Sequence, residues 1–183
     1  DTSLAGFTGR IGADMLTVAT ATGAFADKNV GTGKTVNITG LSLGGADAGN
    51  YTLTNTTAST TADITPASIT AVTGITAADR VYDATTGATL NSGSAGFTGL
   101  LGSDVLTVAT ATGTFANKNV GTGKTVSITG LSLGGADAGN YTLALTTAST
   151  TADITPASIA AITGITADSR IYDATTAATL ATG

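Results

Sequence analysis

The acidic side chains are the first place to look for chemistry in this sequence. All 12 acidic residues are aspartates, and the chain contains no histidine and no cysteine. It therefore lacks the most common general base, thiol nucleophile and soft-metal ligands. Pairs of aspartates can hydrolyse glycosides, but here they lie in turn-like contexts that recur along the chain. These features predict a protein that is not an enzyme.

Carboxylates could instead hold calcium, a hard cation that prefers oxygen ligands. The candidate ligands are Asp47 and Asp137, in the repeated string GGADAGN, and Asp79 and Asp83. A calcium β-roll repeats its glycine-rich string every nine residues or so, whereas GGAD returns only after 90 positions, and no EF-hand loop is present. We expect these aspartates to cap turns, with a calcium-stiffened spacer as an alternative and no other cofactor.

Neighbouring lysines and asparagines raise the possibility of an intramolecular amide cross-link. Lys118 and Lys124 lie close in sequence to Asn117 and Asn119, and Asn140 is a further candidate. Such a bond needs a buried carboxylate beside the reacting pair. Because Lys124 follows a glycine turn that should be exposed, we expect both lysines to be solvated.

The remaining charge is sparse and acidic. The formal net charge is −5, and the 7 lysines and arginines do not cluster. Nucleic-acid binding needs clustered basic residues, and no apolar run approaches the ~20 residues of a membrane helix. Neither nucleic acid nor membrane insertion is expected. The chain starts at Asp1 without a signal peptide, which suggests a segment of a longer protein.

The residues that must position these side chains favour strands. Threonine, valine and isoleucine pack well on pleated surfaces, glycine supplies tight turns, and residues that hold long helices together are scarce. A polar turn is expected over 117–124. Strands are expected over 68–75, 79–90 (with a break at Gly87), 104–115 (one long strand or a pair joined near Gly113), 124–133 (with a bend at Gly130), 140–147 and 149–155. Seven or so short strands predict an all-β, immunoglobulin-like antiparallel β-sandwich.

The chain repeats itself with a period of 90 residues, since GLSLGGADAGNYTL occurs as Gly40–Leu53 and again as Gly130–Leu143. Most residues at this offset are identical, and no gap is needed. Pro66 and Pro156 cannot donate to a strand ladder, so we place the boundaries there. The predicted domains are 1–66, the back of a first repeat; 67–156, a complete repeat; and 157–183, the front of a third. Almost no linker separates them, which predicts a stiff rod.

The incomplete ends of the chain are complementary. The first repeat lacks its opening strands, and residues 157–183 contain strands of that type. Head-to-tail strand complementation between copies would restore whole units.

The repeated DAGNYTL string resembles the corner between strands E and F of immunoglobulin-like domains, where a tyrosine hydroxyl bonds to nearby backbone. We therefore expect a structural role, not a catalytic one, for these residues. They are Asp47, Gly49 and Tyr51 in the first copy, and Asp137, Gly139 and Tyr141 in the second.

Two further strings carry a family resemblance. Arg80–Thr86 (RVYDATT, with Tyr82) and Arg170–Thr176 (RIYDATT, with Tyr172) are similar to the Tyr-Asp-Gly-Thr-Thr signature of YDG/MBG-type repeats. Residues 113–143 match the rest of that pattern. One departure is that Ala84 and Ala174 replace the signature glycine. If that position has a positive φ, alanine is strained there.

The resemblance implies tandem repeats of very large secreted bacterial adhesins, including filamentous-haemagglutinin-like exoproteins. It implies a stalk or fibre outside the cell or on the bacterial surface. The partners would be neighbouring repeats of the same chain or identical copies in a filament. An alternative is an adhesive module that binds glycan or host protein directly. Burial of the four tyrosines, Tyr51, Tyr82, Tyr141 and Tyr172, would count against that alternative.

Overall fold

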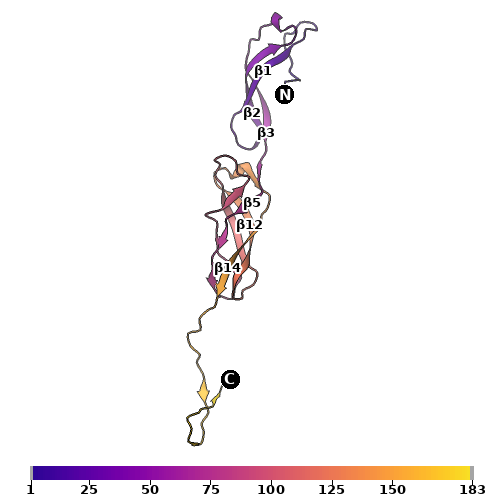
Figure 1. Ribbon diagram of the computed structural model, residues 1–183. Helices are drawn as coiled ribbons and strands as arrows, with labels where there is room; N and C mark the ends of the chain where they lie inside the picture. The colour runs from indigo at the N-terminus through magenta and orange to yellow at the C-terminus, as the bar shows by residue number, and fades with distance from the viewer. Residues whose placement is uncertain (1, 182–183) are drawn as a thin grey trace.

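The computed structural model describes residues 2–181, which form three successive parts of an elongated molecule (Figure 1). We call residues 2–64 the front part, residues 67–155 the central body and residues 157–181 the rear segment. Asp1 and residues 182–183, the outer ends of the predicted first and third repeats, lie outside the described residues. Apart from two short 3-10 turns, η1 (Ala48–Asn50) and η2 (Ala138–Asn140), all regular structure here is strand. The prediction of an all-β chain is confirmed.

The front part is a single antiparallel sheet of three strands in the order β1-β2-β3. The same strand register recurs 90 residues later in the central body. Thr17 lies opposite Gly44 in the front part, and Thr107 lies opposite Gly134 in the central body. The strands of the front part are β1 (Thr17–Phe25), β2 (Gly31–Gly44) and β3 (Ala58–Ile64), and their counterparts are β11 (Thr107–Phe115), β12 (Gly121–Gly134) and β14 (Ala148–Thr155).

The central body adds short strands to this sheet. β7 (Arg80–Val81) and β8 (Gly87–Ala88) extend it to five strands in the order β7-β14-β12-β11-β8. Three short pairs complete the body: β4 (Ala67–Ile69) parallel to β13 (Tyr141–Leu143), β5 (Ala71–Thr73) antiparallel to β10 (Gly96–Thr98), and β6 (Thr76–Ala77) antiparallel to β9 (Leu90–Asn91).

The hydrophobic core lies between the five-stranded sheet and the short pairs. Val126, Ile128 and Phe115 of the sheet are at most 2% exposed, and Ile69 and Ile75 of the opposite side are at most 7% exposed. Leu90 packs between them, in contact with the clusters built around Phe115 and around Ile128. All buried hydrophobic residues among residues 2–181 belong to the central body. The short strands therefore cover one face of the five-stranded sheet, and the hydrophobic core forms between the two.

Two of the predicted strands are divided. The strand expected over 68–75 separates at Thr70 into β4 and β5, because β4 pairs with β13 and β5 pairs with β10. The strand expected over 79–90 is also divided, but the break expected at Gly87 was misplaced. Gly87 begins β8, and the break is the turn around Asp83 that separates β7 from β8.

Two glycine features near β12 have different outcomes. The predicted bend at Gly130 is present, with a φ of 64° and a shift in strand register between Thr110 and Thr112. The predicted turn over 117–124 is too long, because β12 begins at Gly121 and includes Lys124.

The rear segment has one isolated pair of strands, β15 (Thr166–Ala167) and β16 (Leu180–Ala181), which are the counterparts of β6 and β9. Every side chain from 157 to 181 is exposed. No helix within residues 2–181 is long and apolar enough to cross a membrane.

Candidate interface between the front part and the central body

Tyr141 anchors the loop that precedes β11. Its side chain is 7% exposed. The hydroxyl accepts a hydrogen bond from the Leu101 backbone N–H at 3.1 Å and donates one to Asp104 Oδ2 at 2.9 Å. Tyr51 makes the equivalent bonds with Ile11 and Asp14. The tyrosine thus bonds to a loop about 40 residues earlier, and not to the backbone of its own corner as the sequence predicted.

Asp137 fixes the same loop from the other side. Its Oδ2 accepts the Val105 backbone N–H at 2.8 Å, and Asp47 does the same for Met15 at 2.7 Å. Neither side chain caps the 3-10 turn that follows it. Gly49 and Gly139 lie within these turns, where an added Cβ would meet no atom within 4 Å.

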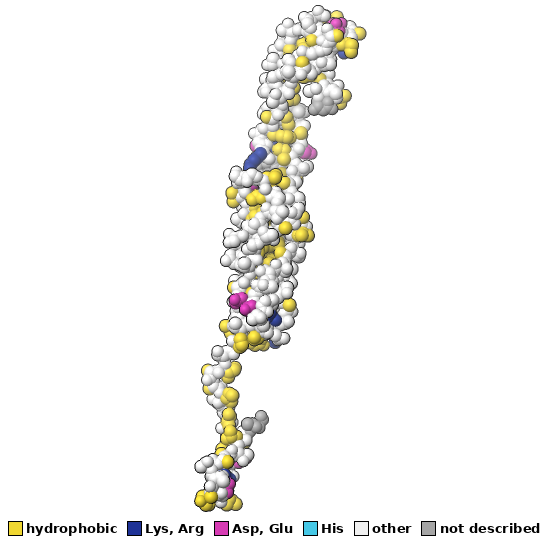
Figure 2. Space-filling view, in the orientation of Figure 1, with side chains coloured by type: hydrophobic (Ala, Val, Ile, Leu, Met, Phe, Trp, Pro, Cys, Tyr) yellow, Lys and Arg dark blue, Asp and Glu magenta, His cyan; other side chains and the backbone are white. Residues whose placement is uncertain are grey.

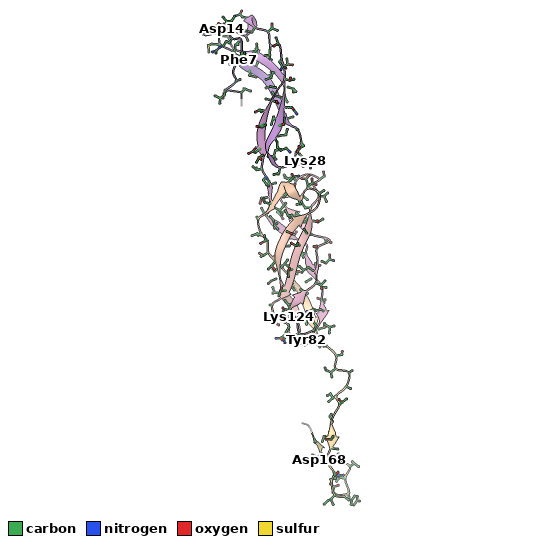
Figure 3. All side chains as sticks on the ribbon, turned by 180° about the vertical axis from the view of Figure 1, so that it is seen from behind. Phe7, Asp14, Lys28, Tyr82, Lys124 and Asp168 are labelled. Atoms are coloured by element: carbon green, nitrogen blue, oxygen red, sulfur yellow. The ribbon has the colours of Figure 1, made fainter. Side chains whose placement is uncertain are left out.

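These bonds hold two carboxylates, Asp104 and Asp137, at the end of the central body that faces the front part. Lys28, from the loop between β1 and β2, reaches both. Its Nζ lies 2.5 Å from Asp104 Oδ1 and 3.5 Å from Asp137 Oδ1. Figure 3 shows Lys28 at the junction between the two bodies. The positive charge of Lys28 offsets part of the repulsion between the carboxylates of Asp104 and Asp137.

The pKa values of the two bonded groups move in opposite directions. The hydrogen bond from Lys28, and then that from Tyr141, lower the pKa of Asp104. The hydrogen bond to Asp104 raises the pKa of Lys28. Both shifts favour the charged forms.

Asn140 adds neutral contacts to this interface. Its Oδ1 accepts the Val30 backbone N–H at 2.9 Å, and its Nδ2 lies 3.4 Å from Asn29 Oδ1. The covalent link between the bodies is also short, because only Thr65 and Pro66 separate β3 from β4. The front part is therefore attached to the central body at two points, the linker and the loop 28–30.

The other two calcium candidates lie elsewhere and accept hydrogen bonds from the chain. Asp79 Oδ1 accepts the Asp153 backbone N–H at 2.7 Å. Asp83 Oδ1 accepts the backbone N–H of Thr85 at 2.9 Å, and this bond is the main cause that lowers the pKa of Asp83. Within residues 2–181, no three carboxylates gather in a group that could hold a metal ion.

The cross-link candidates have different surroundings. Lys124 is half-buried in β12 and donates to Asn117 Oδ1 at 2.7 Å, so the expectation that it is solvated was wrong. The reason is that β12 begins early, which lays the lysine stem beside Gly121. Lys118 is exposed, and Asn119 donates its backbone N–H to Asn117. No carboxylate is bonded to Lys124 Nζ among the described residues.

The turn of the RVYDATT string closes around Arg80. The guanidinium donates to Asp83 Oδ2 at 2.9 Å and to Thr85 Oγ1 at 2.8 Å, and lies 5.0 Å from the centre of the Phe115 ring. Ala84, inside this turn, has a φ of 66°. The position where the family signature has glycine is therefore left-handed, and alanine is strained there.

We expect Ala84→Gly to stabilise the central body by about 0.5–1 kcal/mol, since glycine removes the left-handed strain but costs chain entropy. The melting temperature of the full chain should rise by about 2–6 °C. Ala174→Gly is the matched control. It has a φ of 60° but lies in the exposed rear segment, and it should leave the melting temperature unchanged. A lower melting temperature for Ala84→Gly would contradict this account.

Tyrosine exposure differs between the two copies of the RxYDATT string. Tyr82 is half-buried against the core, whereas Tyr172 is 89% exposed because the rear segment has no sheet to pack on. Sequence reasoning missed Lys28 and Asp104. The signal was present, since both lie in strings that recur 90 residues away, but no local pattern shows that the two strings meet.

Comparison with known proteins gives one match. A family model described as the YDG domain matches residues 1–60 and 65–152. No curated protein and no solved structure matches the chain.

Proposed function

The chain belongs to the YDG domain family, and we propose that it is a non-enzymatic structural repeat that builds a stiff stalk or extracellular fibre of a giant bacterial surface adhesin. In this proposal each period of 90 residues folds as one immunoglobulin-like β-sandwich. The core between the five-stranded sheet and the short pairs of the central body supports that reading. The length of the rod would then be set by the number of repeats.

The observation that carries this proposal is the junction at Lys28. A two-residue linker alone would leave the front part free to swing about Pro66. The contacts of Lys28 with Asp104 and Asp137, and of Val30 with Asn140, add a second point of attachment. Attachment at two points fixes the orientation of the front part relative to the central body, so successive units stay in line. A stalk that projects a distant tip requires this property, whereas a freely jointed chain would collapse.

The tyrosines count only in part against the adhesive alternative. Aromatic rings that stack on sugars must be exposed. Tyr141 is buried and its hydroxyl holds the loop before β11, whereas Tyr172 is 89% exposed. The calcium alternative is also weaker, because Lys28 already bonds to the acidic pair at the junction.

We expect Lys28→Glu to loosen the junction, because it places a third carboxylate beside Asp104 and Asp137. The chain has no cysteine, so the variants Thr22→Cys and Thr112→Cys give one exposed dye site in each body. Single-molecule energy transfer should report a narrow distance distribution in the parent chain and a clearly broader one with Lys28→Glu. Lys118→Glu, which makes the same change of charge on a lysine away from this junction, should keep the narrow distribution. A broad distribution in the parent chain would refute the stiff rod.

The pH dependence of the same distribution provides a second arm of that test. Because the folded pKa of Asp104 is lowered, the contribution of this carboxylate to the stability of the junction is fully present above the ordinary aspartate pKa. That contribution is lost as the pH falls through the lowered value. Because the folded pKa of Lys28 is raised, the contribution of the lysine to the junction is present below the ordinary lysine pKa and is lost as the pH rises through the raised value. The distribution should therefore stay narrow between about pH 4 and pH 10 and broaden outside that window.

A further inference from the structure

Four asparagines are each followed, two positions later, by a threonine. They are Asn37, Asn50, Asn55 and Asn140. The pattern Asn-x-Ser/Thr is the one that enzymes read when they attach a sugar to an asparagine amide. Sequence alone treats the four alike, but a transferase must reach the amide nitrogen and the hydroxyl together. The surroundings of the four side chains therefore decide which of them can accept a sugar in the folded chain.

Asn55 lies in the exposed loop between η1 and β3. Its Oδ1 accepts the Thr57 backbone N–H at 3.1 Å and the Thr57 Oγ1 hydroxyl at 3.0 Å. This is the turn that an asparagine side chain forms with the backbone two residues further on. It holds the amide and the hydroxyl of one acceptor pattern against each other. Asn55 Nδ2 makes no hydrogen bond within residues 2–181, so the nitrogen that would take the sugar is free.

Asn140 is already used at the junction. Its Oδ1 accepts the Val30 backbone N–H at 2.9 Å, and its Nδ2 lies 3.4 Å from Asn29 Oδ1. A bulky sugar on Nδ2 would push the loop 28–30 away from the central body. Asn50 is the counterpart of Asn140 one period earlier. Among the described residues, neither side chain is bonded to the threonine of its own pattern.

Asn37 is held inside a strand. It lies in β2 between Ala24 of β1 and Ser59 of β3. Side chains two residues apart in a strand share a face but stand roughly 6–7 Å apart, so Thr39 is not held against the Asn37 amide. Strand pairing on both sides also prevents this segment from bending into a transferase. Of the four patterns, only the one at Asn55 combines exposure with contact between its two polar side chains.

The loop around Asn55 has the same backbone contact in the central body, which has a hydrophobic core. The Leu41 N–H donates to Thr56 O, and the Leu131 N–H donates to Thr146 O, both at 3.1 Å. Leu145, the counterpart of Asn55, is 56% exposed although the front part is attached to the central body. A side chain at this position is therefore exposed in a packed unit with a neighbour in place.

The loop offers polar groups without charge. Residues 51–60 contain no aspartate, lysine or arginine. Figure 2 shows few charged side chains on the visible face of the front part. Recognition of this loop by an enzyme would therefore depend on its amide and hydroxyl groups.

We propose that Asn55 accepts an N-linked sugar in the folded chain. The donor is a sugar whose anomeric carbon is joined to a phosphate, either of a nucleotide or of a lipid. Nδ2 forms a bond to the anomeric carbon, the bond from that carbon to the phosphate oxygen breaks, and the phosphate leaves with the electron pair. A base of the transferase takes the displaced amide proton. The site is independent of the stalk function proposed above, because neither Asn55 nor Thr57 takes part in the junction at Lys28.

The test is transfer of sugar to the purified, folded full chain, followed by intact mass and peptide mapping. One arm uses UDP-glucose with a soluble asparagine glucosyltransferase, and the other uses a lipid-linked oligosaccharide with a membrane oligosaccharyltransferase. An unstructured Asn-x-Thr peptide confirms that each enzyme is active. At least one arm should add one glycan per chain, at Asn55, and the productive arm identifies the donor. Modification of the peptide but not of the chain in both arms would overturn the proposal.

Two substitutions check the acceptor itself. Asn55→Gln should remove the added mass, and Thr57→Ser should keep it, because serine retains both the hydroxyl and the backbone N–H that bond to Asn55 Oδ1. Transfer to Asn37 or Asn140 as fast as to Asn55 in the folded parent chain would contradict the selection that the structure predicts.

The central body provides a matched test of the loop. Leu145→Asn places the pattern Asn-x-Thr at the counterpart of Asn55, and Ser127→Asn places the same pattern in β12, at the counterpart of Asn37. Both positions are exposed. Leu145→Asn should add a second glycan, whereas transfer to Ser127→Asn should be at least tenfold slower. Equal transfer to the two variants would show that exposure alone selects the site, and would overturn the proposal.

Discussion

Replacing Phe115 with alanine should lower the free energy of unfolding of the central body by about 3–5 kcal/mol, the usual cost of removing a buried phenylalanine. The ring is 2% exposed and packs with Val126, Ala152 and Ile154 in the largest cluster of buried residues. It also carries the Arg80 guanidinium above its face. Small bodies have few kilocalories of net stability, so this variant should be largely unfolded near body temperature. Chemical denaturation of the full chain, followed by circular dichroism, measures the loss.

The internal repeat supplies a matched control for this variant. Phe25 has the same position in β1 but is 41% exposed. Phe25→Ala should change the unfolding of the central body by less than about 0.5 kcal/mol, as expected for a surface site. Equal effects of the two substitutions would mean that the front part has a core of its own.

The second large effect is expected at Arg80. Its side chain is 17% exposed and makes hydrogen bonds to Asp83 and Thr85 in addition to the contact with Phe115. Arg80→Met keeps the apolar stem but removes the charged head. The free energy of unfolding should fall by about 2–3 kcal/mol, because the variant loses the hydrogen bonds of a charged, partly buried guanidinium and one cation–π contact. Thermal unfolding of the full chain measures this loss.

Arg170 is the control for Arg80. It makes the same bonds to Asp173 and Thr175, but it lies in the rear segment, where no phenylalanine ring packs against it. Arg170→Met should leave the unfolding transition in place. If Arg80→Met also leaves the transition in place, the turn is held by Asp83 and Thr85 alone, and the arginine has no part in stability.

The features that depend on local sequence were predicted correctly. The abundance of threonine and valine predicted strands, and the Gly130 bend is a positive-φ glycine within β12. The prediction that alanine is strained at position 84 if φ is positive was also correct, because the turn requires a left-handed backbone conformation there whichever side chain is present. Each of these depends on the residue itself and its immediate neighbours.

The features that depend on a distant partner were not predicted. The string YTL is a strand at 141–143 and not at 51–53, although the letters are identical, because only the first has β4 beside it. The same holds for the site. Nothing near Lys28 in the sequence shows that the Tyr141 hydroxyl would hold Asp104 in front of it. For such pairs, the positions of the two residues in the sequence do not show that they lie close together in the fold.

The parallel pairing of β4 with β13 has a mechanical consequence. The chain enters the central body through β4 and leaves it through β14, so tension along the molecule pulls on these two strands. The hydrogen bonds run across the strands and are loaded together, in shear. β14 pairs with β12 through residue pairs that extend from Gly121–Ile154 to Ile128–Ala148, whereas β4 pairs with β13 only from Ala67 to Ile69. Under a pulling force the entry strand should give way first and the long sheet last, so a stretched molecule would lengthen by releasing β4 before its main sheet fails.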